Sequence, residues 1–346
     1  MSEMVQIGNR IIGSDQPVYI IAEAGVNHNG DLETAIKMVD EAADAGADAV
    51  KFQTFSTERV ISRSAHKAAY QTGTEGDTQF DMVKKLELPL EDFRTLRSHC
   101  ERSGIEFLST PFDDQSLDFL VSAGMRAVKV SSCDINNLPF LDAVAEKHLP
   151  ILLSTGMSNL DEVDRAVALC SSRCPLVLMQ CTTNYPAAFG SLNLRVISAY
   201  RKRYGIPVGL SDHSPGSVAP IAAVALGACL IEKHFTLDHS LPGPDHKASL
   251  DIDELRQMIS AVRNTELALG DGVKRPFAEE LEIAEVARRS IVASRRIHRG
   301  AEITMEMLEA KRPGTGIPPD RSNSEIGRKA RRTIEADEVI AWEDLD

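Results

Sequence analysis

The stretch Leu210–Asp238 reads LSDHSPGSVAPIAAVALGACLIEKHFTLD and decides how the rest of the chain is interpreted. It contains two histidines, His213 and His234, each just past a short apolar run. The segment between them has the composition of a single helix. An apolar run, a helix and a second apolar run form the repeating unit of a parallel sheet. The sequence therefore predicts two neighbouring parallel strands, each ending beside a histidine.

The same alternation extends outward over the first two thirds of the chain. Apolar runs rich in β-branched residues are typical of parallel strands covered on both faces. Eight such runs occur, at 18–25, 48–55, 105–112, 127–132, 150–156, 176–182, 207–212 and 229–235. Eight strand–helix units in about 250 residues predict a (β/α)8 TIM barrel. A doubly wound open sheet is the alternative, but it usually has fewer strands and needs a glycine-rich first turn.

The alternation stops after Asp271, which predicts a change of domain. We expect a barrel domain over 1–270, a linker with a helical piece over 271–285, and a small domain of short strands and turns over 286–346. The second strand–helix connection, Thr57 to about Lys85, is unusually long and is a candidate active-site loop.

Composition and charge narrow the possible functions. The chain has 346 residues and a net charge of −13, which disfavours nucleic acid as a partner because a phosphate backbone needs a basic surface. No apolar run is long enough to predict a membrane span, and no secretory signal is visible at the N-terminus, so we expect a cytoplasmic protein. The six cysteines show no metal-site or redox spacing, so we expect buried, reduced thiols.

The two histidines are candidate metal ligands. In a TIM barrel the active site lies at the carboxyl ends of the strands, so residues that end adjacent strands project into one mouth. There, His213 and His234 could share a divalent cation with positions left open for substrate and water. Two unrelated polar histidines near strand ends are the alternative.

Two lysines, Lys51 and Lys129, stand inside apolar runs, where a charged group is costly unless it is paired or reaches a site. They could form a Schiff base, as in an aldolase, clamp a carboxylate or phosphate, or serve as structural ion-pair partners. Glu23 ends the first run and could activate a water or pair with one of the lysines. Several hydroxyls at the same level favour anion binding: Thr110, Ser132, Ser154 and Ser211.

Eight motifs along the chain resemble those of the sialic acid synthases, which include N-acetylneuraminate synthases and the bacterial legionaminic and pseudaminic acid synthases. The motifs are IAEAGVNHNG, AVKFQTF, FLSTPFD, ILLSTGM, SDHS, EKHFTLD, GPDHKASL and KRPGTGIP, in this order. The resemblance implies a TIM barrel followed by a small antifreeze-like (SAF) domain, and a domain-swapped homodimer. It also implies condensation of phosphoenolpyruvate with an N-acetylmannosamine-type sugar, with release of phosphate.

The resemblance implies a role for individual residues, and we expect Glu23, Lys51, Lys129 and Asp134 to be the catalytic ones. It implies manganese, with magnesium or cobalt as alternatives, on His213 and His234, and a water-activating carboxylate at Glu23. Lys51 and Thr110 would hold the carboxylate of phosphoenolpyruvate. Its phosphate would contact Lys129, Ser132, Ser154, Thr183 and Ser211. The sugar would contact Gln53, Asp134, Tyr185, Asp245 and, from the small domain, Arg312.

Two departures from the family pattern affect the choice of sugar. Asp134 stands where many members carry glutamate, and Thr183 where some carry asparagine. The resemblance first suggests an N-acetylneuraminate synthase, whose acceptor is an N-acetylmannosamine-type sugar. The alternative is a legionaminic or other nonulosonic acid synthase, whose acceptor is a 2,4-diacetamido sugar. A metal-independent Schiff-base aldolase and a sugar-binding barrel without turnover are the rivals from other classes.

Overall fold

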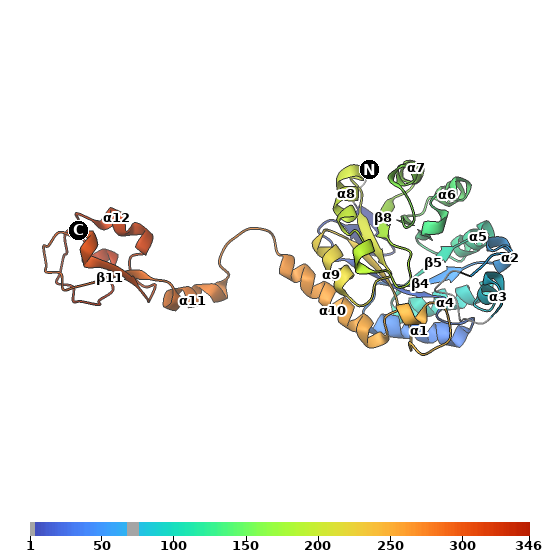
Figure 1. The fold of residues 1–346 in the computed structure, drawn as a ribbon, viewed down its shortest axis with the longest axis horizontal. Helices are drawn as coiled ribbons and strands as arrows, with labels where there is room; N and C mark the ends of the chain where they lie inside the picture. The colour runs from blue at the N-terminus through green and yellow to red at the C-terminus, as the bar shows by residue number, and fades with distance from the viewer. Residues whose placement is uncertain (1–3, 68–75) are drawn as a thin grey trace. The chain divides into compact units, whose positions relative to one another are not determined.

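The computed structural model describes residues 4–67 and 76–346 and divides the chain into two compact units (Figure 1). The first unit is Met1–Gly270 and the second is Asp271–Asp346. Each unit has a hydrophobic core of its own, so the two are described separately below.

All eight predicted strands are present in the first unit and form one parallel sheet. They are β3 (Tyr19–Gly25), β4 (Ala49–Thr54), β5 (Glu106–Pro111), β6 (Val128–Val130), β7 (Ile151–Ser154), β8 (Leu176–Cys181), β9 (Val208–Asp212) and β10 (Leu230–His234). The strand order is β5-β4-β3-β10-β9-β8-β7-β6, and β6 also lies against β5, so the sheet nearly closes on itself. The predicted TIM barrel is confirmed, and the doubly wound alternative is wrong.

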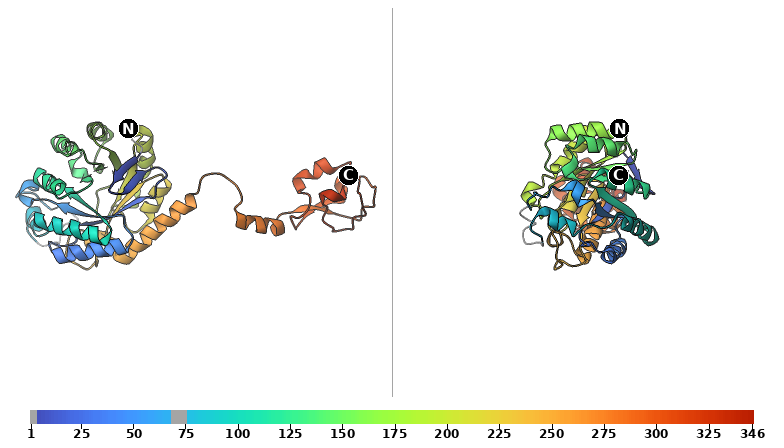
Figure 2. Two further views of the ribbon diagram at one scale, coloured as in Figure 1. Left: turned by 180° about the vertical axis from the view of Figure 1, so that it is seen from behind. Right: turned by 90° about the vertical axis from the view of Figure 1, so that its right-hand side faces the viewer.

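A helix follows each strand and covers the outside of the sheet, as Figure 2 shows from behind. The covering helices are α1 (Leu32–Asp44), α4 (Leu90–Ser103), α5 (Asp114–Ser122), α6 (Leu138–Ala145), α7 (Leu160–Ser171), α8 (Arg195–Tyr204), α9 (Val218–Ala225) and α10 (Ile252–Leu269). Several begin at a side-chain cap that satisfies a free backbone N–H group; in α1, for example, Asp31 accepts from the Thr34 N–H. None of the described helices is long and apolar enough to cross a membrane.

A hairpin that the sequence analysis missed precedes the barrel. It pairs β1 (Met4–Ile7) with β2 (Arg10–Gly13). Its buried residues Val5, Ile7 and Ile12 form one apolar cluster with residues at the beginning of the barrel strands, including Tyr19 and Ala49. The hairpin therefore closes the amino-terminal end of the barrel interior and leaves the carboxyl end for a site.

The long connection after β4 has structure of its own. Its described part contains two short helices, α2 (Thr57–Val60) and α3 (Gln79–Lys84), and residues 68–75 lie outside the described part of the chain. Glu87 stabilises the start of this connection, because its carboxylate accepts hydrogen bonds from the N–H and hydroxyl groups of Thr57 at 3.0 and 2.8 Å. The helix α3 brings Gln79 to the cavity described below.

The second unit contains α11 (Ala278–Ala287), β11 (Ser290–Ala293), β12 (Leu308–Lys311) and α12 (Ser322–Glu325). The strands β11 and β12 pair antiparallel. Isoleucines dominate the small core: Ile291, Ile297, Ile303, Ile317, Ile334 and Ile340. The segment predicted as a linker, 271–285, holds most of α11. The loop after β12 meets this helix where Gly314 donates to the Glu285 carbonyl at 2.7 Å.

The six cysteines are all free, and five are buried as expected. The exception is Cys133, whose side chain is exposed and lines the cavity at the carboxyl end of the barrel.

Candidate active site

Alternation along β9 and β10 decides which side chains reach the barrel mouth. Ser211 is paired in register with Glu232, and both line the cavity. The next pair in register, Asp212 and Lys233, is not among the lining residues. His213 and His234 follow and line the cavity again. Successive side chains of a strand point to opposite faces, which explains this pattern.

The cavity at the carboxyl end of the barrel has a volume of about 440 Å³. Most of the predicted site residues line it: Glu23, Lys51, Gln53, Thr110, Lys129, Ser132, Ser154, Thr183, Tyr185, Ser211, His213 and His234. Residues from many different strands and loops thus meet around one space large enough for a small polar substrate.

The ammonium group of Lys51 is buried among oxygen atoms. Its Nζ lies 2.7 Å from Glu23 Oε2 and 2.9 Å from the Thr110 hydroxyl. The lysine side chain is only 3% exposed. A buried ammonium with a carboxylate and a hydroxyl beside it is ready to exchange one of these partners for an anionic ligand.

The second lysine, on β6, has a similar environment. Lys129 Nζ donates to the Ser154 hydroxyl at 2.7 Å and to the Val130 carbonyl at 3.1 Å. Burial lowers the pKa of Lys129, and the nearby Glu232 carboxylate opposes that effect. A lysine of lowered pKa also suits a Schiff base, which is the chemistry of the rival aldolase.

Glu232 joins the two lysines and was not selected as a site residue from the sequence. Its carboxylate oxygens lie 3.8 Å from Lys51 Nζ and 3.7 Å from Lys129 Nζ, and one accepts from the Ser211 hydroxyl at 2.9 Å. Burial acts to raise the pKa of Glu232, but the two lysines together lower it. The sequence does contain a signal that could have identified Glu232. It stands two residues before His234, and alternation along a strand places both side chains on one face.

Glu23 has the electrostatics of a proton acceptor. Burial raises its pKa to about 7, although Lys51 opposes the shift. Gln53 donates to Glu23 Oε1 at 3.3 Å and holds the carboxyl group on the cavity side. A carboxyl group with a pKa near neutrality can exchange a proton with water efficiently.

The two predicted metal ligands lie side by side, with ring centroids 5.4 Å apart. His213 Nδ1 donates to the Thr182 carbonyl at 2.7 Å, which leaves Nε2 as the nitrogen with a free lone pair. His234 Nδ1 is buried and has no hydrogen-bond partner among the described residues. Burial lowers the pKa of His234 well below its ordinary value, so this ring is neutral and able to bind a cation.

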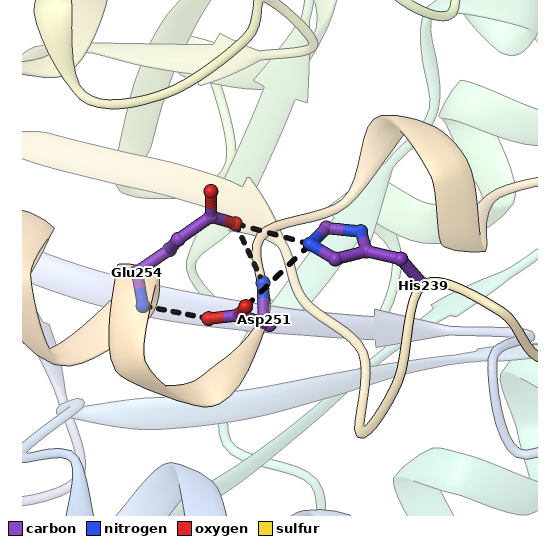
Figure 3. A group of neighbouring side chains, drawn as sticks. All are labelled: His239, Asp251 and Glu254. Carbon is purple, nitrogen blue, oxygen red and sulfur yellow. Dashed lines mark hydrogen bonds and ion pairs between the residues drawn. The ribbon is translucent and has the colours of Figure 1, made fainter.

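These features fit a divalent cation held by two imidazoles. Within the described part of the chain, no group of three metal-capable side chains includes both histidines, so the remaining ligand positions would be left to water or substrate. A different group, His239, Asp251 and Glu254, does bring three possible ligand atoms within 4.8 Å of one another (Figure 3). Its two carboxylates already cap the first turn of α10, where the helix dipole disfavours a cation.

Of the remaining predicted residues, Thr183 lines the cavity, and Asp134, Asp245 and Arg312 do not. Thr183 is half-buried in the cavity wall. Gly156 lies beside it and must be glycine, because a Cβ at position 156 would lie 2.6 Å from Thr183 Cγ2. Burial raises the pKa of Asp245 to about 6, opposed by His213, and burial likewise raises the pKa of Asp134. Arg312 is exposed on the second unit, directly after β12.

Taken together, the fold and the cavity define a TIM-barrel enzyme whose site can hold a small, multiply charged anion beside a two-histidine centre. Comparison with known proteins agrees. The model of the NeuB family matches residues 38–274, and that of the SAF domain matches residues 288–346. The chain belongs to the NeuB family and carries a C-terminal SAF domain, as the resemblance implied.

Individual relatives cover almost the whole chain. The N,N'-diacetyllegionaminic acid synthase of Legionella pneumophila is 44% identical over 342 residues, 96% of either chain. The N-acetylneuraminate-9-phosphate synthase of Homo sapiens is 36% identical over 97% of this chain and 95% of its own. Among solved structures, the N-acetylneuraminic acid synthetase of Leptospira borgpetersenii is 37% identical with a TM-score of 0.73, covering 82% of this chain and 96% of that one.

Proposed function

We propose that this chain condenses phosphoenolpyruvate with an N-acetylated amino sugar to give a nonulosonic acid and inorganic phosphate. The observation that carries the proposal is the pair of buried lysines, Lys51 and Lys129, with hydroxyl groups at 2.9 and 2.7 Å and Glu232 between them. Two ammonium groups fit the two charged ends of phosphoenolpyruvate, its carboxylate and its phosphate. Family membership and the names of the relatives support the same reaction class.

The identity of the sugar is the finer part of the proposal. N-acetylneuraminate synthesis was our first expectation, but the relatives favour the alternative. The legionaminic acid synthase is 44% identical, against 36% for the N-acetylneuraminate-9-phosphate synthase. We therefore propose a 2,4-diacetamido-6-deoxy sugar as the preferred acceptor, bound by Gln53, Tyr185, Asp134 and Asp245.

The chain's own residues account for the bond changes. C3 of phosphoenolpyruvate attacks the aldehyde carbon of the open-chain sugar, and positive charge develops at C2. Glu23, with a pKa of about 7, takes a proton from the water that adds to C2. The C–O bond to phosphate then breaks while the new C2 hydroxyl loses its proton to become the ketone, and the alkoxide formed from the aldehyde takes up a proton. Lys129, with Ser132, Ser154 and Ser211, stabilises the departing dianion.

A divalent cation on His213 and His234, manganese by preference, would supply Lewis-acid polarisation of the aldehyde oxygen when bound. The fixed tautomer of His213 and the unpartnered Nδ1 of His234 support such a site. We also propose that two copies form a domain-swapped dimer and that Arg312 of one copy contacts the acetamido group of a sugar in the other. A cytoplasmic location stays a prediction.

The deciding experiment measures phosphate release from phosphoenolpyruvate by the purified chain. The sugars tested are N-acetylmannosamine, its 6-phosphate and a 2,4-diacetamido-6-deoxy hexose, each with chelator and with chelator followed by excess manganese. We expect manganese-dependent release that is fastest with the diacetamido sugar. If phosphate is released with none of the sugars, the proposed synthase activity is refuted. Borohydride trapping of pyruvate on Lys51 or Lys129, with chelator-resistant turnover, would favour the Schiff-base aldolase instead.

A further inference from the structure

A buried ion pair lies directly beside the two histidines, on residues that do not line the cavity. Lys233 Nζ is 2.6 Å from Asp212 Oδ2, and the two side chains are 1% and 0% exposed. The residues are partners in the register of β9 and β10. The pair is therefore a cross-strand link at the point where both strands end.

The link also holds the loop after β9. Asp212 Oδ1 accepts from the Ser214 N–H at 2.9 Å, and Lys233 Nζ donates to the Ser214 carbonyl. Both sides of Ser214 are thus bound to the same ion pair. His213 stands between Asp212 and Ser214, and His234 follows Lys233. The backbone on both sides of His213 and on one side of His234 is fixed by these contacts.

Stability alone does not explain such a pair. Taking two charges out of water costs several kcal/mol per ion, and well-packed apolar residues of similar volume are often as stable or more stable. The histidines, by contrast, need positioning. The ring of His213 has the Thr182 carbonyl to orient it, whereas His234 Nδ1 has no partner among the described residues. The rings of Tyr185 and His213 lie beside the His234 ring, with centroids 5.5 and 5.4 Å away, but no hydrogen bond from a described residue to Nδ1 orients it. The position of the backbone at the end of β10 therefore contributes directly to where this ring lies.

We propose that Lys233 and Asp212 are positioning residues that set the separation of His213 and His234 for a divalent cation. They act through the backbone and contact neither substrate nor cation. The inference rests on the metal site of the proposed function and adds the two residues that would hold its ligands in place. Groups that position metal ligands typically change metal affinity by about 10- to 100-fold when they are altered.

The test measures binding of Mn²⁺ alone to the full-length chain after treatment with a chelator, with unbound Mn²⁺ read from its electron paramagnetic resonance signal. The main variant replaces both charges, Asp212→Leu with Lys233→Met, so that no unpaired charge is left buried. A milder variant, Asp212→Asn, keeps the shape of the side chain and decides the question if the double variant fails to fold. Val262→Ala, in the buried face of α10, is the control for a purely structural loss.

We expect the double variant to fold and to bind Mn²⁺ about 10- to 100-fold more weakly than the parent chain. Raising the Mn²⁺ concentration should restore its phosphate release, whereas raising the sugar concentration should not. Val262→Ala should lower the unfolding midpoint and keep the parent affinity for Mn²⁺.

Parent-like affinity in the folded double variant, or in Asp212→Asn when the double variant does not fold, overturns the inference. If the parent chain itself binds no Mn²⁺, the metal site fails and this inference fails with it. Phosphate release from phosphoenolpyruvate is measured separately, so that result would leave the condensation reaction standing on its own test.

Discussion

Replacement of Lys129 by methionine tests most directly the hypothesis that the cavity binds the phosphate of phosphoenolpyruvate. The change keeps the length of the side chain and removes one buried ammonium group, whose Nζ lies 2.7 Å from the Ser154 hydroxyl and 3.7 Å from Glu232. Glu232 keeps two partners in the variant, the Ser211 hydroxyl at 2.9 Å and Lys51 at 3.8 Å. We therefore expect the variant to fold.

The size of the effect follows from the hydrogen bonds that Lys129 would give to phosphate. A hydrogen bond to a charged group contributes about 1.5–3 kcal/mol. Since 1.4 kcal/mol is a tenfold change, phosphoenolpyruvate should bind about 10- to 150-fold more weakly. The value of kcat should also fall, because the phosphate becomes a separate dianion as it leaves and depends on Lys129 more strongly then than in the bound substrate.

Two measurements separate these effects. Calorimetric titration with phosphoenolpyruvate in the absence of sugar gives the binding loss, and steady-state phosphate release gives kcat and kcat/KM. Lys37→Met, at an exposed position of α1, is the matched control and should change neither. Unchanged binding and unchanged kcat/KM in a folded Lys129→Met chain would refute the assignment of Lys129 to the phosphate.

The remaining predictions concern the metal, the sugar and the partner chain. His213→Ala should abolish manganese-dependent phosphate release while the unfolding midpoint stays close to that of the parent; near-normal turnover in excess chelator contradicts the metal site. Asp134→Ala should raise KM for the sugar or lower kcat, with little change in affinity for phosphoenolpyruvate, and an equal loss for both substrates would mark Asp134 as structural. Glu232→Gln should tighten inhibition by inorganic phosphate, because a negative charge leaves the anion site; weaker inhibition argues against that charge balance. Mixing Arg312→Ala chains with His213→Ala chains should recover one working site per mixed dimer, and no recovery after proven subunit exchange would exclude assembly of the site in trans.

The barrel could be predicted from the sequence because its signal is repetitive. Eight apolar runs, each followed by a helical segment, leave few alternative folds, and all eight became strands. The hairpin β1–β2 could not be found in the same way. Its two strands have four residues each, and Val5, Ile7 and Ile12 are buried only because the open end of a finished barrel lies against them. Their environment depends on residues far away in the chain.

The site residues likewise divide into those that local sequence patterns could predict and those that depend on residues far away in the chain. Alternation within a strand was enough to bring Ser211, His213 and His234 to one space. It did not show that Glu232 would stand between Lys51 and Lys129, because that requires the curvature of the sheet and the strand order. Asp134 ends the 3-10 turn Ser132–Asp134 and Asp245 precedes the 3-10 turn His246–Ala248, both beyond the strands, where the alternation of a strand does not fix the direction of a side chain.

The stretch Leu210–Asp238 explains why two histidines stand one helix apart. At the end of each strand three consecutive residues alternate between the cavity and the outer side of the sheet. They are Ser211, Asp212 and, directly after β9, His213 in one case, and Glu232, Lys233 and His234 of β10 in the other. The first pair places a carboxylate beside the lysines, the second forms the buried link at 2.6 Å, and the third presents two imidazoles. Because the first two pairs are consecutive in register and the histidines follow them directly, a slip of one residue between the strands would disrupt all three at once. The ion pair makes that slip costly, since it would leave two buried charges unpaired.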